Sequence, residues 1–266
     1  SEHHREALLV VVRPLVEMHI LPLMLGCFTA TAGAETPETG ASAAVPLTMC
    51  VEALRAVVDI SSTSNASTTT SLMTALLLRI QTLVGELRLS DCGDVAGLVP
   101  KILQNSDFKM MHTVLSLPVV VRDRVMAHRL QCNGSEISRI VHGFSSLNAT
   151  DQQRQIRDQI LAACILRTMQ TVPLMTPEEL LCTLEAYLRI RCSHSSLIGV
   201  LLARIADNGG AFSLEQTVRL VRFCTQLTNY DGKVHKACVA TAQPVFLGLV
   251  SHLLRNDVMA IVGTAD

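Results

Sequence analysis

The feature of this sequence that most constrains the fold is one helical face that recurs three times in the C-terminal half. The three segments begin at Ser135, Glu178 and Glu215, which are 43 and 37 residues apart. In each segment, mostly apolar residues follow the i, i+4, i+7, i+10 spacing of one side of an α-helix. A repeat of this length is typical of stacked helix pairs, because one pair cannot bury its apolar face alone. The equivalent core positions are Ile137, Leu180 and Thr217; Val141, Leu184 and Val221; Phe144, Tyr187 and Cys224; and Leu147, Ile190 and Leu227.

Each of the three segments has a helix-start signal, and a second helical stretch follows it. Small polar residues or an N1 proline occur at Asn133-Gly134-Ser135, Thr176-Pro177-Glu178 and Ser213-Leu214-Glu215. The second helices are expected at 153–169, 195–206 and 234–254. The sequence therefore predicts an all-α fold, an α-solenoid of stacked antiparallel helix pairs with a period of about 37–45 residues.

Weaker copies of the repeat are expected nearer the N-terminus. The pattern L-x-x-x-L-L-x-R-I occurs at 72–80 and again at 197–205, about three repeats apart. Earlier pairs are therefore placed at 48–60 with 71–87 and at 90–104 with 118–130. Chance similarity between leucine-rich helices is the alternative explanation.

The domain organisation expected from the sequence has four parts. Residues 1–27 form apolar helices, and residues 28–47 form a flexible linker of small and polar residues. Residues 48–134 hold degenerate repeats with a Ser/Thr-rich insertion at 61–70, and residues 135–266 hold the clearer repeats. Charged residues and prolines interrupt the apolar start, so no membrane span is expected. The chain begins with Ser, and a targeting segment upstream is consistent with that.

Composition and motifs argue against several classes of protein. The net charge is -1, and 49% of residues are hydrophobic while only 17% are charged. This balance excludes a disordered chain and a protein that holds nucleic acid by bulk charge. The nine cysteines form no C-x-x-C pair, so neither a metal nor a cofactor is expected, and free thiols fit a reducing compartment. No catalytic motif occurs, and we expect Cys192-Ser193-His194 to be a capped turn rather than a nucleophile site, so the chain is predicted not to be an enzyme.

One polar constellation on the first helices is a candidate binding surface. It joins the trios Arg139, His142 and Ser146; Cys182, Glu185 and Arg189; and Arg219, Arg222 and Gln226. Stacking of the repeats would align these trios into an arginine-bearing ridge, which could contact RNA phosphates or an acidic partner. An ordinary solvated face is the competing interpretation. The candidate RNA- or partner-binding residues are Arg139, Arg189, Arg219 and Arg222.

The segments TPEELLCTLEAYLRIRCSHSSLIGVLLARIAD and FSLEQTVRLVRFCTQL resemble degenerate helical repeats of mitochondrial RNA-metabolism proteins. The most similar families are the FAST-kinase-like and heptatricopeptide repeats, and the Ser/Thr/Ala-rich insertions resemble kinetoplastid members. The resemblance implies a non-catalytic scaffold subunit of an RNA-editing ribonucleoprotein in the mitochondrial matrix. Its expected partners are other protein subunits and single-stranded, guide or messenger RNA, with no DNA and no membrane. A mitoribosome assembly factor of the same repeat type, or an armadillo- or HEAT-like adaptor without an RNA role, is the alternative.

Overall fold

The computed structural model describes residues 46–61, 67–105, 111–192, 194–228, 240, 243–248 and 250–251. In these ranges the regular structure is helical throughout, and no strand occurs. The expectation of an all-α fold is therefore confirmed for the described part of the chain. The chain divides into two compact units, Ser1–Arg124 and Val125–Asp266. The predicted helices of 1–27, nearly all of the predicted linker at 28–47, and most of the helix predicted at 234–254 lie outside the described residues.

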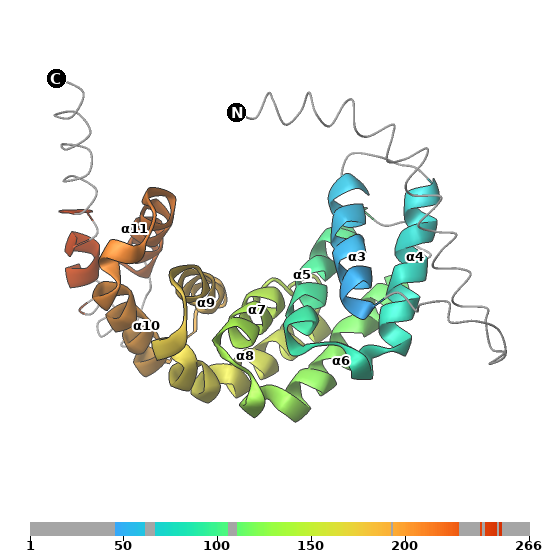
Figure 1. Ribbon diagram of the computed structural model, residues 1–266, viewed down its shortest axis with the longest axis horizontal. Helices are drawn as coiled ribbons and strands as arrows, with labels where there is room; N and C mark the ends of the chain where they lie inside the picture. The colour runs from blue at the N-terminus through green and yellow to red at the C-terminus, as the bar shows by residue number, and fades with distance from the viewer. Residues whose placement is uncertain are drawn as a thin grey trace, which may run out of the picture. The chain divides into compact units, whose positions relative to one another are not determined.

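In the first unit, helix α3 packs against both α4 and α5. Its apolar face, which includes Leu54 and Val57, is buried. Two ion pairs of 3.0 Å, Arg55 with Asp94 and Lys101 with Asp59, join α3 to α5 along the rim of this contact. The helices are α3 (Leu47–Ser61), α4 (Ser67–Thr82), the short 3₁₀ helix η2 (Val84–Glu86), α5 (Leu89–Asn105) and α6 (Met111–His128), which contains the boundary between the units (Figure 1).

Two predicted boundaries in this part of the chain are wrong. Helix α4 begins at Ser67, so residues 67–70 belong to a helix rather than to the Ser/Thr-rich insertion, and Thr69 is buried. Helix α6 begins at Met111 and carries Pro118 inside it, whereas a helix over 118–130 was predicted. Proline removes one backbone hydrogen bond, but burial of Val114, Leu117 and Val121 compensates for that loss.

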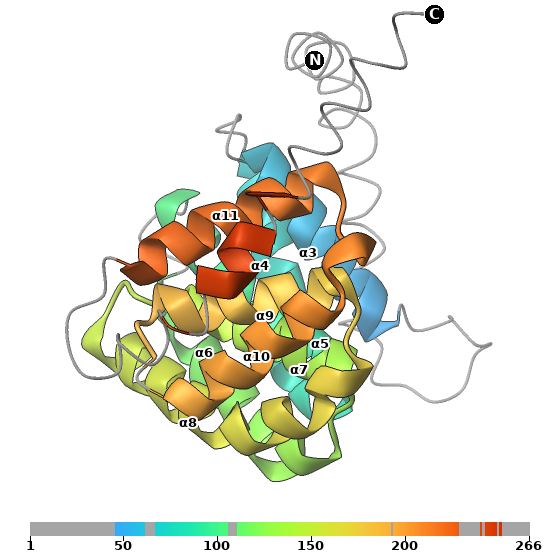
Figure 2. The same ribbon diagram turned by 90° about the vertical axis from the view of Figure 1, so that its left-hand side faces the viewer.

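The second unit arranges its helices in two rows. Helices α7, α9 and α11 follow one another, and α9 contacts both of the others (Figure 1). Helix α8 contacts α7 and α10, and α10 contacts α9; Figure 2 gives the perpendicular view of the same helices. The elements are η4 (Arg129–Gln131), α7 (Gly134–Ser145), α8 (Asp151–Thr171), η5 (Val172–Leu174), α9 (Pro177–Arg189), α10 (Ser195–Asp207), η6 (Gly209–Ala211) and α11 (Leu214–Thr228).

The first helices start where the polar signals predicted. At α7 and α9, the side chains of Asn133 and Thr176 accept from the backbone three residues later, and a glutamate at that position bonds back to the cap. Ser213 and Gln216 make the same reciprocal pair of hydrogen bonds at α11. Each capping box satisfies backbone N–H groups that the first turn leaves open.

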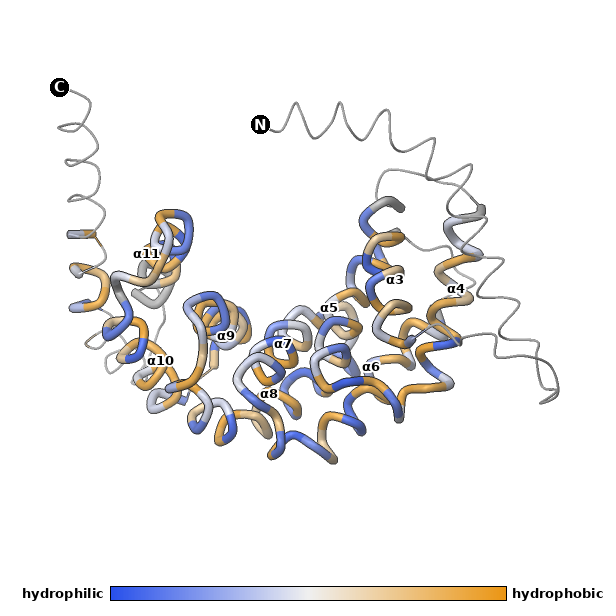
Figure 3. The backbone as a smooth tube through the Cα atoms, in the orientation of Figure 1, coloured by the Kyte–Doolittle hydropathy of each residue, from blue (hydrophilic) through white to orange (hydrophobic). Residues whose placement is uncertain are grey.

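The predicted core register is confirmed at most positions that can be checked. Apolar and polar residues alternate along the helices (Figure 3), and Ile137, Leu180 and Thr217 are all fully buried. Burial is also complete at Val141, Leu184, Phe144, Tyr187 and Leu147, whereas Val221 and Ile190 are half-buried. The side chains of Cys224, Gln226 and Leu227 lie outside the described part of the chain.

Candidate partner-binding surface

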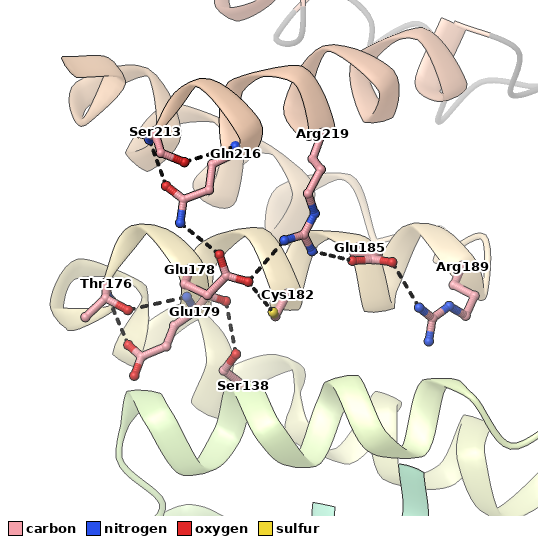
Figure 4. A network of polar contacts seen from close by, with 10 residues as sticks. All are labelled: Ser138, Thr176, Glu178, Glu179, Cys182, Glu185, Arg189, Ser213, Gln216 and Arg219. Carbon is pink, nitrogen blue, oxygen red and sulfur yellow. Dashed lines mark hydrogen bonds and ion pairs between the residues drawn. The ribbon is translucent and has the colours of Figure 1, made fainter. Parts of the chain in front are cut away.

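The most extensive polar cluster shown in the second unit lies between α9 and α11 (Figure 4). The Arg219 guanidinium of α11 donates to Glu178 Oε1 at 3.2 Å and to Glu185 Oε2 at 3.1 Å. Gln216 of α11 donates to the other oxygen of Glu178 at 2.8 Å. Because residues on the first two turns of α11 meet two acids that lie two turns apart on one face of α9, the cluster fixes the register of the two helices.

The same cluster extends from α9 toward α7. Glu185 Oε1 accepts from Arg189 Nη2 at 3.0 Å, so one carboxylate serves two arginines. The other terminal nitrogen of Arg189 donates to Ser145 Oγ of α7 at 2.9 Å. Ser138 of α7 donates to the backbone oxygen of Glu179 at 3.0 Å. Polar contacts therefore join α7 to α9 and α9 to α11.

Partial burial and these hydrogen bonds shift the protonation equilibria of the cluster. Burial raises the pKa of Glu178, but hydrogen bonds from Gln216, Cys182 and Arg219 outweigh it and hold that pKa below its ordinary value. Burial lowers the pKa of Arg219, but the two carboxylates outweigh it, so the net shift is upward. Burial, followed by the hydrogen bond to Glu178, raises the pKa of the Cys182 thiol to about 11. At neutral pH Glu178 and Arg219 are thus charged, and the Cys182 thiol is protonated.

The four predicted binding arginines occupy different environments. Arg139 on α7 and Arg222 on α11 are exposed. Arg189 is exposed too and pairs with Glu185, and the side chain of Arg219 is 32% exposed because it turns toward α9. The structure brings Arg189 and Arg219 together on Glu185, so an acid of the same unit neutralises these two arginines.

The sequence placed Glu185 and Cys182 in the polar constellation but did not predict the contacts that they make. Glu178 entered only as part of a helix-start signal, and Gln216 and Ser145 were given no part in the surface. The sequence did hold a signal for the contact between α9 and α11. In the repeat register, the acids of α9 and Arg219 of α11 fall on adjacent stripes of neighbouring helices. What the sequence does not show is that Arg219 turns back toward the preceding helix.

Cys192 and His194 lie in the connection between α9 and α10. His194 caps α10, since its Nδ1 accepts from the backbone N–H of Leu197 at 3.2 Å. Burial raises the pKa of the Cys192 thiol. This arrangement matches the predicted capped turn. Within the described ranges, no three His, Cys, Asp or Glu residues form a group suited to a metal ion. Among the helices that are described, none combines the length and apolarity needed to cross a membrane.

Comparison of the chain with protein-family models, with curated proteins and with solved structures gives no match.

Proposed function

We propose that this chain is a non-catalytic α-solenoid scaffold subunit that acts through protein–protein contacts. The observation that carries the proposal is a set of side-chain hydrogen bonds between first helices whose partners lie 34–44 residues apart in sequence. Asp59–Lys101 is separated by 42 residues, Ser138–Glu179 by 41, Ser145–Arg189 by 44, Glu178–Arg219 by 41, Glu178–Gln216 by 38 and Glu185–Arg219 by 34. Contacts that recur at about one repeat length are what a stack of equivalent helix pairs requires.

The charge distribution favours a protein partner over RNA. Glu178 and Glu185 neutralise Arg219 and Arg189, and the whole chain has a net charge of -1. RNA binding through the backbone needs several uncompensated cations, because its affinity comes from phosphate neutralisation. Other arginines also lie beside acids, namely Arg55, Arg88, Arg122, Arg154 and Arg157.

The resemblance of residues 176–207 and 212–227 to kinetoplastid mitochondrial repeats supports an RNA-processing assembly in the mitochondrial matrix. In that assembly the chain would hold protein subunits together, and its contact with single-stranded RNA would be secondary. The proposed partners are therefore the neighbouring subunits of a ribonucleoprotein.

The test replaces Arg219 and Arg222 together by glutamine in the full-length chain. The matched control replaces Arg154 and Arg157 of α8 by glutamine, which removes the same amount of charge from the chain. Because Arg219 anchors α11 to α9, we expect the first variant to lose copurifying subunits while its affinity for single-stranded RNA changes little. The control should retain both properties.

Two other outcomes contradict the proposal. Loss of RNA affinity with intact assembly, and a salt slope reduced by about 0.7 per phosphate contact, would indicate an RNA track. Unchanged assembly and unchanged RNA affinity would leave the ridge as an ordinary solvated face. If the wild-type chain copurifies with protein subunits but with no RNA, the armadillo- or HEAT-like adaptor is favoured. If ribosomal proteins are among the copurifying subunits, the mitoribosome assembly factor is favoured.

A further inference from the structure

Each first helix of the second unit carries a row of residues that we call its forward stripe. In the repeat register the stripe has the i, i+3, i+7, i+10 spacing of one narrow helix face. It comprises Ser135, Ser138, His142 and Ser145 on α7; Glu178, Leu181, Glu185 and Leu188 on α9; and Glu215, Val218 and Arg222 on α11.

On α7 the forward stripe is covered by α9. Ser138 is only 2% exposed and donates to the backbone oxygen of Glu179. Ser145 is equally buried and accepts from Arg189. The two contacts occur in the same order along both helices, so α9 runs in the same direction as α7.

On α9 the centre of the forward stripe is buried at the junction with α11, and Glu178 at its start stays exposed. Leu181, at the position equivalent to Ser138, is fully buried. Glu178 and Glu185 lie on either side of it along the stripe, and both accept from Arg219 (Figure 4). The junction therefore combines a buried apolar centre with charged contacts at its edge, as a stable helix interface does.

On α11 the forward stripe is exposed. Val218, equivalent to Ser138 and Leu181, is 48% exposed, and the adjacent Leu214 is 60% exposed. Glu215 and Arg222 on the same stripe are exposed as well. The opposite side of α11 is packed, since Thr217 and Leu220 are fully buried. The exposed face is thus the one that the next first helix covers at the two preceding junctions.

We propose that the forward stripe of α11 binds an amphipathic helix of a partner protein, which continues the row of α7, α9 and α11. The inference rests on the proposed scaffold function and names its contact surface. Continuity with the two existing junctions predicts a helix parallel to α11 with an apolar residue against Val218. A basic or amide side chain would reach Glu215, as Arg219 and Gln216 reach Glu178.

The acid on the stripe defines the partner further. Glu215 stands at the position that Glu178 holds on α9, where Arg219 and Gln216 of the next first helix donate to the carboxylate. The partner helix should therefore bring a cation or an amide to Glu215. An acid and two apolar residues within this face disfavour RNA phosphate as the occupant.

The first experiment places a photo-crosslinking amino acid at position 218 of the tagged full-length chain in its native cells. Position 166 is the control, because Leu166 is an exposed apolar residue, 62% accessible, on α8. We expect position 218 to cross-link to one helical segment of a partner subunit, identified by mass spectrometry of the linked peptide. That segment should carry an apolar stripe and the cation or amide that faces Glu215.

The second experiment compares Val218→Lys with Leu166→Lys. Lysine favours helices, so both variants should keep the wild-type circular dichroism and melting temperature. Val218→Lys should lower recovery of the cross-linked partner at least about tenfold, the equivalent of about 1.4 kcal/mol, and Leu166→Lys should leave it unchanged. Glu215→Lys should also lose the partner, and exchanging the partner's facing cation for glutamate should restore it.

The remaining outcomes overturn the inference. These are cross-links from position 218 to residues 229–266 of the same chain or to a second copy, cross-linking no stronger than from position 166, or undiminished recovery with Val218→Lys. If those results occur while the wild-type chain still copurifies subunits, the scaffold function stands and only the surface is wrong. A wild-type chain that copurifies no subunit overturns both.

Discussion

Replacing Leu184 by alanine tests whether the α7–α9–α11 row shares one core. Leu184 is fully buried on α9, which has helices on both sides. Deletion removes carbon atoms equivalent to about three methylene groups, or about 2.4 kcal/mol of transfer free energy at about 0.8 kcal/mol each. The two flanking helices limit collapse into the cavity, so the expected loss of unfolding free energy is about 3–5 kcal/mol.

The assay is chemical denaturation of the full-length chain followed by far-UV circular dichroism. Val221→Ala, at the equivalent but half-buried position, should cost about 0.5–1.5 kcal/mol, because less of its side chain leaves the core. Leu166→Ala, at an exposed position of α8, should stay within about 0.5 kcal/mol of wild type. A cost below about 1 kcal/mol for Leu184→Ala, indistinguishable from Leu166→Ala, would refute the shared core.

Three further predictions concern the α9 junctions. Arg219→Gln should lower the unfolding free energy by about 0.5–1.5 kcal/mol, because a partly exposed pair of ion pairs is lost, and Arg154→Gln should cost less in the same denaturation series. The folded pKa of Glu178 lies below its ordinary value, so the carboxylate stabilises the fold above that ordinary value and this stabilisation is lost as the pH falls through the folded pKa. Between about pH 5 and about pH 3, Glu178→Gln should therefore lose less unfolding free energy than the wild type does. Arg191 lies two residues after the end of α9 and has a φ of 52°, and the next residue, Cys192, donates its backbone N–H to the Tyr187 oxygen. Arg191→Gly should therefore raise the unfolding free energy by up to about 1 kcal/mol in the same denaturation series, whereas a loss of stability would show that the arginine side chain matters more than its backbone strain.

The sequence was sufficient to predict the helices between residues 134 and 228 and most of their buried faces. Polar caps at Asn133, Thr176 and Ser213 start the first helices because they satisfy local backbone groups, and such contacts lie within four residues of sequence. Burial at Leu180 and Leu184 follows from helical periodicity. Both kinds of signal are local, so a single sequence displays them.

The candidate site was less predictable, because its contacts join residues far apart in sequence. The pairs Arg219–Glu178 and Arg189–Ser145 span 41 and 44 residues. The repeat register places these residues on neighbouring helices, but it does not give the direction in which a long arginine side chain turns. For the same reason the half-burial of Val221 was missed: the register assigns equivalent positions, whereas burial depends on whether a further helix covers them.

The central claim, a scaffold that holds protein subunits by its repeat surface, is tested most directly by quantitative mass spectrometry of the purified native complex with and without ribonuclease. The account predicts that the same subunits stay bound at the same stoichiometry after the RNA is digested, since acids of its own unit neutralise Arg189 and Arg219. Release of those subunits on digestion would contradict it and would show that RNA, rather than the helical repeats, holds the assembly together.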